Sequence, residues 1–341
     1  MMSLLENPIL KLYVTLIVWV AVGFMLGRKL PKETPKKFGQ LLYWVGVPIS
    51  IIAFLRRADL SGWIWISPLT AWIAILVGAG LAWIWIDLGV TDERLKRLAR
   101  GIELTTSGEI PVLADQRSAL PTSSWSKSTQ GSFLLAMMVG NTGYLGYPVI
   151  LTLVGSENFA WALFYDLLGT TLGAYGLGVA LAARFGIGQQ KEKWFVKAML
   201  KNPALWSMVF GLGFRALPLP SLAAQGLQSA AWGVVTLSLI LIGMQLSQLP
   251  SLNKLQQALT CLGIKMLLTP LVVGTGLMFF GVTGAPRLVL VLQMAMPPAF
   301  ATLVITEAYN LDRELTITAL AFGYVGLLFT LPIWIWLFGG G

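Results

Sequence analysis

Two clusters of helix-breaking and polar residues interrupt long apolar stretches of the sequence. Residues 140–148 read Gly-Asn-Thr-Gly-Tyr-Leu-Gly-Tyr-Pro within the apolar run 130–154, and Met296-Pro297-Pro298 lies within the run 286–308. Proline removes a backbone donor and displaces the carbonyl four residues earlier. Inside a bilayer, non-helical backbone survives only within protein or beside a water-filled cavity. The sequence therefore predicts two broken helices next to a cavity.

The expected chemistry of this cavity is anion binding. Proline suits a first helical position, so we expect the second half of each broken helix to start near Pro148 and Pro298. Free N–H groups and the helix dipole make such ends favourable for anions. A simple proline kink is the alternative, and it explains one break more easily than two matching ones. The predicted substrate-binding residues are Asn141, Thr142, Gly143, Tyr144, Pro148, Gln293, Pro297 and Pro298.

Three ionisable residues fall within or near apolar runs: Asp166, Lys265 and Glu307. A charge at the bilayer centre costs at least about 2.5–3.5 kcal/mol, so it is rarely accidental. Lys265 is interpreted as a counter-charge for an anionic substrate or as a coupling group that pairs with Asp166. A structural salt bridge between helices is the alternative for both. Glu307 is a further coupling candidate, although its position favours an interfacial residue.

The composition indicates that the elements holding these residues are transmembrane helices. The chain has 341 residues, of which 56% are hydrophobic and 11% charged, against about 25% charged in soluble domains. The N-terminus lacks the features of a signal peptide, so we expect its first apolar run to be kept. A span needs about 20 apolar residues. We predict an all-α membrane protein with ten spans, at residues 9–27, 38–55, 65–88, 130–154, 158–184, 203–217, 224–247, 255–281, 286–308 and 314–338.

The basic residues alternate along the chain in a way that supports this number of spans. Most lie in the odd-numbered loops: Arg28, Lys29, Lys32, Lys36, Lys37, Arg94, Lys96, Arg97, Arg100, Arg117, Lys127, Arg184, Lys191, Lys193, Lys197, Lys201, Lys254 and Arg313. Cytoplasmic loops carry an excess of Lys and Arg. We therefore expect a multi-pass protein of the cell (inner) membrane with both termini outside the cytoplasm. This distribution explains the net charge of +9 without nucleic acid as a partner.

Five spans in each half imply that the halves have opposite orientations, as in an inverted repeat. Residues 1–88 form the first three spans and 129–185 the fourth and fifth, while 202–341 form the second repeat. The segments 89–128 and 186–201 are predicted cytoplasmic loops, the first of them partly disordered or with one short amphipathic helix. Without the segment 89–128, corresponding spans of the two halves have the same spacing.

The chain resembles bacterial permeases of the auxin efflux carrier family over nearly its whole length. The motif 140–148 is similar to their fourth-helix motif, and 296–310 together with Leu331-Pro332 resembles their last two helices. Pro48 and Asn202-Pro203 also fit the family pattern. In plant members Asn and Pro are adjacent at the crossover, whereas Asn141 and Pro148 are seven residues apart here, so auxin-specific contacts are not carried over.

The resemblance implies ten helices in two inverted five-helix repeats, with helices four and nine broken and crossing. It further implies an elevator mechanism, export or exchange of small organic anions such as carboxylates, and a homodimer, although no dimer face is recognisable in the sequence. The positions of Asp166 and Lys265 also resemble those of the Asp and Lys in sodium/proton antiporters of this architecture.

We therefore predict a secondary transporter for a small organic anion, in which one domain moves relative to a scaffold of spans one, two, six and seven. A sodium- or proton-coupled symporter or antiporter, with H+ or Na+ as a second partner, is the alternative. A membrane-embedded enzyme is disfavoured because the chain has no His, no Asp-Asp-x-x-Asp motif and no nucleophile elbow. A channel or receptor would not require paired broken helices. Neither a cofactor nor a metal is expected.

Overall fold

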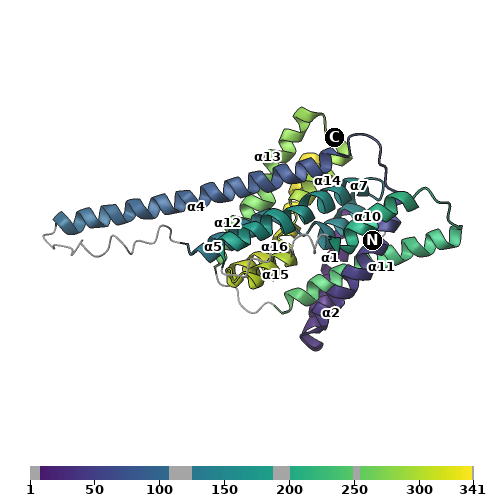
Figure 1. The fold of residues 1–341 in the computed structure, drawn as a ribbon, viewed down its shortest axis with the longest axis horizontal. Helices are drawn as coiled ribbons and strands as arrows, with labels where there is room; N and C mark the ends of the chain where they lie inside the picture. The colour runs from purple at the N-terminus through teal and green to yellow at the C-terminus, as the bar shows by residue number, and fades with distance from the viewer. Residues whose placement is uncertain (1–7, 107–124, 187–199, 249–253, 340–341) are drawn as a thin grey trace.

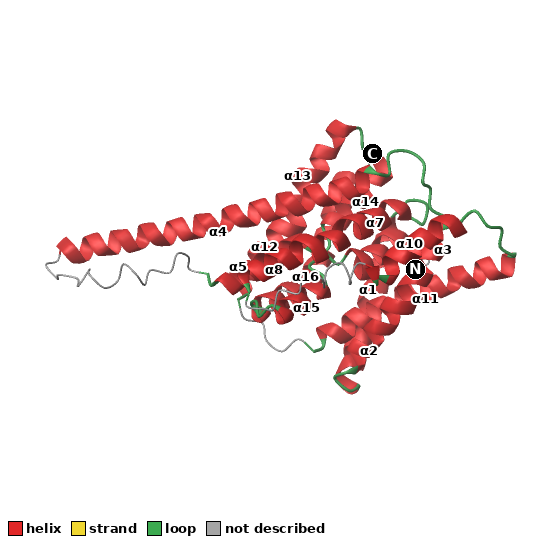
Figure 2. Cartoon of the chain, viewed as in Figure 1, coloured by secondary structure: helices red, strands yellow, loops and turns green. Residues whose placement is uncertain are grey.

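The computed structural model describes residues 8–106, 125–186, 200–248 and 254–339, with the backbone alone for 89–106. Within these residues the elements are helical and no strand is present (Figure 2). Seven helices in this part of the chain are long and apolar enough to cross a membrane: Ile9–Lys29, Thr34–Leu55, Ile66–Leu88, Phe159–Phe185, Ser221–Leu246, Leu255–Phe280 and Arg313–Phe338. The other three predicted spans are also helical, but they form shorter pieces.

The first half of the chain begins with long helices and then a broken one. Its elements are α1 (Pro8–Lys29), α2 (Thr34–Leu41), η2 (Leu42–Gly46), α3 (Val47–Leu55), α4 (Ile66–Thr106), α5 (Lys127–Met138), η3 (Thr142–Gly146), α6 (Tyr147–Leu153), α7 (Phe159–Phe164), η4 (Tyr165–Thr171), η5 (Ala174–Gly178) and α8 (Val179–Phe185). The segments η2, η3, η4 and η5 are π-helical.

The second half contains a short helix, three long ones and another broken one. Its elements are α10 (Pro203–Phe214), α11 (Ser221–Leu246), α12 (Leu255–Gly263), η6 (Ile264–Leu268), α13 (Thr269–Gly276), η7 (Leu277–Phe280), α14 (Gly284–Met294), α15 (Phe300–Ala308) and α16 (Arg313–Phe338). The segment η6 is π-helical and η7 is a 3-10 helix.

Helix α4 is longer than the sequence predicted. Residues 89–128 were expected to be a loop, partly disordered or with one short amphipathic helix of its own, but α4 continues without interruption to Thr106 and extends from the helix bundle as a rod (Figure 1). The stretch 89–106 contains three Leu, three Arg and two Glu and no proline, and these residues favour helix even without tertiary contacts. Residues 107–124 of the predicted loop, and 187–199 of the next one, lie outside the described residues.

The helices pack as two groups. The first group comprises residues 8–55 and 203–246, in which α1 runs along α11 and α3 packs on α10 and α11. A Cβ on Gly23 would lie 2.0 Å from the Ile240 carbonyl oxygen, and one on Gly243 would lie 2.0 Å from that of Val20. Glycine therefore allows the backbones of α1 and α11 to touch. The second group comprises the remaining described helices.

Contacts between loops follow the predicted sides of the membrane. Gln248 donates to the Lys32 carbonyl at 3.1 Å, and Lys254 pairs with Asp312, so these contacts join odd-numbered loops. The Asp59 amide donates to the Glu157 carbonyl at 2.9 Å, and Arg56 donates to the Leu217 carbonyl, just after α10, at 2.9 Å, which joins even-numbered loops. Each of these contacts links loops that the charge pattern assigns to one side.

Candidate functional site

The two interrupted helices meet at their breaks. The first ends at Met138 and resumes at Thr142, and the second ends at Met294 and resumes at Phe300. Gly140 and Pro298 form an antiparallel β-bridge. The backbone amide of Asn141 donates to the Pro297 carbonyl at 2.8 Å, and the backbone amide of Ala299 donates to the Val139 carbonyl at 3.0 Å. Each break thus satisfies backbone groups that the other has freed.

The prediction that each second half-helix starts near its proline was wrong for Pro148, whereas the other half-helix does start close to Pro298. The first begins at Thr142, directly after the non-helical Asn141, and Pro148 lies inside the helix behind the π-helical segment η3. The wider π turn accommodates a residue that cannot donate to the carbonyl four residues earlier. In the second broken helix, Pro298 lies in the unwound segment, two residues before Phe300.

A cavity of about 170 Å³ lies beside the crossing, between the two helix groups. Pockets for drug-sized ligands have volumes of about 300–1,000 Å³, so this one suits a small solute. The first turns of both second half-helices line it, and neither turn has a side-chain cap. Its principal lining residues are Tyr43, Ser50, Gly140, Asn141, Thr142, Gly143, Tyr144, Tyr147, Pro148, Asp166, Thr170, Tyr175, Asn202, Ser238, Ala299 and Ala301.

Asp166 places a carboxylate at this cavity. It is buried in the π-helical segment η4, and it accepts hydrogen bonds from the Thr142 hydroxyl at 2.5 Å and the Tyr147 hydroxyl at 2.6 Å. A Cβ on Gly143 would lie 3.3 Å from Asp166 Oδ2. The carboxylate therefore stands at the N-terminal turn of the first half-helix, where the dipole stabilises negative charge.

Lys265 lies on the other side of the crossing and does not line the cavity. Its Nζ and the Met296 carbonyl oxygen each lie 3.4 Å from the position that a Cβ on Gly140 would occupy. Among the described residues, no ion pair between Lys265 and Asp166 forms. The ammonium instead sits where α5 and α14 end, and a cation is favourable at helix C-termini.

Asn141 connects the crossing to α16. Its side-chain amide donates to the Tyr324 hydroxyl at 2.9 Å, and its own carbonyl accepts from Gly146 at 3.0 Å. Asn141 is buried and contributes to the cavity wall. This residue therefore holds the first break in place and also faces the candidate site.

The structure brings some predicted site residues together and leaves others elsewhere. Asn141, Thr142, Gly143, Tyr144, Pro148 and Asp166 line the cavity, whereas the other predicted residues do not. Pro297 and Pro298 form the crossing itself. Gln293 is fully buried against Gly146 and donates to the Ala162 carbonyl at 3.2 Å. Glu307 forms an exposed ion pair with Arg313 at 2.8 Å.

Sequence reasoning missed the wall of the cavity that the first helix group provides. Tyr43 and Ser50 come from η2 and α3, Asn202 precedes α10, and Ser238 comes from α11, where its hydroxyl lies 3.1 Å from the Tyr144 carbonyl. None of them is charged, and only Asn202, which precedes Pro203, stood out in the sequence, where it fitted the family pattern. Nothing in the local sequence distinguishes Tyr43, Ser50 and Ser238 from ordinary packing residues.

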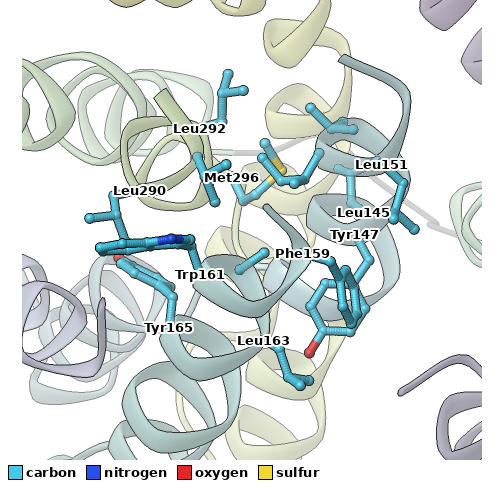
Figure 3. Close-up of a cluster of buried hydrophobic side chains, with 14 of the residues drawn as sticks. Leu145, Tyr147, Leu151, Phe159, Trp161, Leu163, Tyr165, Leu290, Leu292 and Met296 are labelled. Carbon is cyan, nitrogen blue, oxygen red and sulfur yellow. The ribbon is translucent and has the colours of Figure 1, made fainter. Parts of the chain in front are cut away.

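An apolar cluster supports the cavity from behind. Figure 3 shows Tyr147, Phe159 and Leu163 close together, with Trp161 and Tyr165 beside Leu290. The Tyr147 and Phe159 rings pack edge to face with their centroids 5.0 Å apart. The cluster joins the first broken helix to α7 and α14. Close packing of this kind fixes the direction of the Tyr147 hydroxyl toward Asp166.

Comparison with known proteins places this architecture among transporters. Residues 125–335 match the family model described as membrane transport protein. An uncharacterized transporter of Methanothermobacter thermautotrophicus is 28% identical over 323 residues, which cover 94% of this chain and 95% of the relative. An uncharacterized transporter of Methanocaldococcus jannaschii is 29% identical over 212 residues, or 61% of this chain and 68% of the relative.

Proposed function

The chain belongs to the membrane transport protein family, the family of the auxin efflux carriers, and we propose that it is a secondary transporter that carries a small organic anion, such as a carboxylate, through the cavity at the crossing. The observation that carries this proposal is the meeting of two uncapped half-helix N-termini on one small cavity. Free amides at such ends bind anions without a basic side chain.

The proposed binding residues are those that face the cavity from the first broken helix. Asn141 and Thr142 supply an amide and a hydroxyl, and the amides of Gly143 and Tyr144 belong to the uncapped first turn. Ala299 and Ala301 contribute the backbone of the other half-helix. Lys265 supports the crossing from behind and adds a positive field there, so we assign it a positioning role.

The two helix groups suit an elevator mechanism. The cavity has one wall from each group, so a displacement of the second group along the first would carry the cavity across the membrane. The tight contact of α1 with α11 makes the first group a rigid scaffold. This is the set of spans one, two, six and seven for which the sequence predicted that role.

Ten spans with both termini outside remain our proposal for the topology. Odd-numbered loops contact odd-numbered loops, and even-numbered loops contact even-numbered ones. This supports the inverted five-helix repeats and the assignment of the basic odd-numbered loops to the cytoplasm. In this proposal the two interrupted helices and the short helix α10 are the remaining three spans, in addition to the seven long ones.

Counterflow in proteoliposomes tests the function. Vesicles that hold the purified protein are loaded with one unlabelled carboxylate at a time and diluted into a trace of the same compound in labelled form, with mono- and dicarboxylates compared in separate assays. We expect at least one small carboxylate to accumulate transiently and saturably, and protein-free vesicles to show no such exchange. Exchange of cationic or neutral solutes only, with every carboxylate inactive, would refute anion transport.

A further inference from the structure

We propose that Asp166 binds a proton together with each substrate anion, so that the protein moves the anion and the proton in the same direction. This inference rests on the proposed function, because it concerns how the same cavity accepts an anion. Of the two hypotheses from the sequence, an anion carrier without ion coupling and a sodium- or proton-coupled transporter, it favours a proton-coupled symporter.

The carboxylate of Asp166 occupies one of the two positive ends that make the cavity an anion site. Its oxygens accept from Thr142 and Tyr147 at 2.5 and 2.6 Å, and Oδ2 lies 3.3 Å from where a Cβ on Gly143 would stand. A substrate anion in a cavity of about 170 Å³ must therefore lie close to this carboxylate. Two carboxylates that share one site cannot both stay ionised, so one of them takes up a proton.

Among the residues that the structure describes, no cation forms an ion pair with Asp166 that would offset this repulsion. The groups that face it are Tyr144 from η3, Tyr147 from α6, its neighbour Tyr165 and, across the cavity, Tyr175 from η5. The helix α4 packs against the same segment, where Trp72 donates to the Leu168 carbonyl, and Gln293 of α14 donates to Ala162 in the adjoining α7; neither side chain titrates. The nearest buried ammonium, that of Lys265, stands beyond Gly140 at the helix C-termini and forms no ion pair with Asp166 in the described residues.

The proton step balances without a further reactant. A proton from water on one side adds to a carboxylate oxygen of Asp166 when the anion binds, and it returns to water on the other side when the anion leaves. Thr142 and Tyr147 can each accept or donate a hydrogen bond, so the neutral acid keeps its partners.

The test uses vesicles with the full-length protein and the carboxylate that the counterflow assay identifies. Uptake is measured with an inward proton gradient, an inward sodium gradient or neither, while an internal fluorescent dye reports pH. For the wild type we expect a proton gradient to raise initial uptake at least tenfold and the anion to acidify the lumen as it enters. Uptake driven by sodium alone, or anion entry without acidification, would overturn proton coupling.

Two variants assign the proton to Asp166. In Asp166→Asn we expect any remaining exchange to be independent of pH, and retained acceleration by the proton gradient would contradict the assignment. Tyr147→Phe removes one hydrogen bond that stabilises the carboxylate and keeps the ring against Phe159. The pH of half-maximal uptake should then move upward, and an unchanged midpoint would count against Asp166. Wild-type counterflow without proton coupling would defeat only this inference, whereas absent carboxylate counterflow would defeat the proposed function itself.

Discussion

At the scale of single residues, the sequence identified the polar groups near the two breaks but not which of them face the cavity. Asn141 and Thr142 were recognisable because polar residues beside glycines are conspicuous in an apolar run. Gln293 was equally conspicuous, yet it is sealed between Gly146 and the Ala162 carbonyl and does not reach the cavity. Local sequence cannot separate these cases, because the direction of a buried side chain depends on which helix packs against it.

Asn141→Ala should reduce anion counterflow at least tenfold. The change removes the hydrogen bond to Tyr324 and a polar group of the cavity wall. Size-exclusion chromatography should still give folded, monodisperse protein, because the backbone contacts of the break remain. The matched control is Asn158→Ala, since Asn158 lies outside the cavity and its side chain caps no helix. Wild-type counterflow from Asn141→Ala would remove this residue from the site.

Lys265→Met should abolish counterflow, for a different reason. Methionine keeps much of the side-chain volume but removes the ammonium that stands against Gly140 and the Met296 carbonyl. We expect the crossing to lose its compensating charge and the substrate site to lose its shape. Counterflow rates are compared with those of Lys265→Arg, which keeps the charge and should recover part of the activity. Equal rates in Lys265→Met and the wild type would contradict a positioning role.

At the scale of elements, prolines and π-helical segments occur together. The segments η2, η3 and η6 are each followed directly by an α-helix with proline in its first two positions: Pro48, Pro148 and Pro270. A π turn shifts the hydrogen-bond ladder where proline lacks its amide. Hydropathy and charge predicted where the helices lie. The preference of proline for a first helical position suggested a start near Pro148, because the sequence does not show where the pattern of backbone hydrogen bonds shifts.

The contact between α1 and α11 depends on glycine, and this gives a stability prediction. Gly243→Ala would place a methyl group 2.0 Å from the Val20 carbonyl oxygen, so the helices must separate. We expect a loss of about 1–3 kcal/mol and a lower melting temperature in detergent. Gly233→Ala on the same helix is the control, because nothing lies within 4 Å of its added Cβ. Melting curves that do not distinguish the two variants would show that the contact is loose.

The N-terminus of α16 is held by a polar cluster with a predictable pH dependence. Burial raises the pKa of Asp312. Hydrogen bonds from Lys254, Thr129 and the Leu315 amide lower this pKa by more than burial raises it, so the net pKa lies below its usual value. A lowered pKa means that this carboxylate stabilises the fold above its unfolded pKa, about 3.9, and that the contribution is lost as pH falls through the lower folded pKa.

Asp312→Asn should therefore melt at a lower temperature than the wild type from pH 7 down to about 4, by an amount that corresponds to about 1–3 kcal/mol, and the difference should shrink below that pH. The control is Glu307→Gln, which breaks an exposed pair with Arg313 and should cost less than about 1 kcal/mol. A difference that persists unchanged at acidic pH would show that the Asp312 charge is not responsible.

At the scale of the whole molecule, sequence patterns predicted much of the arrangement. Apolar runs indicated the helices, and the alternation of basic loops agrees with the loop contacts of the structure. The patterns did not predict the extension of α4 to Thr106 or the cavity wall from α3 and α11. Both depend on information that one window of sequence lacks: helix stability outside the bilayer, and packing between distant helices.

The central claim is that the substrate binds in the cavity between the two helix groups, and a cysteine on the scaffold wall tests it directly. Ser238 lies on α11 and lines the cavity, where its hydroxyl donates to the Tyr144 carbonyl, while the native Cys261 is buried and is replaced by Ala. In Ser238→Cys we measure the rate of labelling by a small thiol reagent with and without the transported carboxylate, and exposed Ser61→Cys serves as the control. We predict that the carboxylate slows labelling at position 238 at least fivefold and leaves position 61 unchanged. Equal labelling rates at position 238 with and without the substrate would contradict the account.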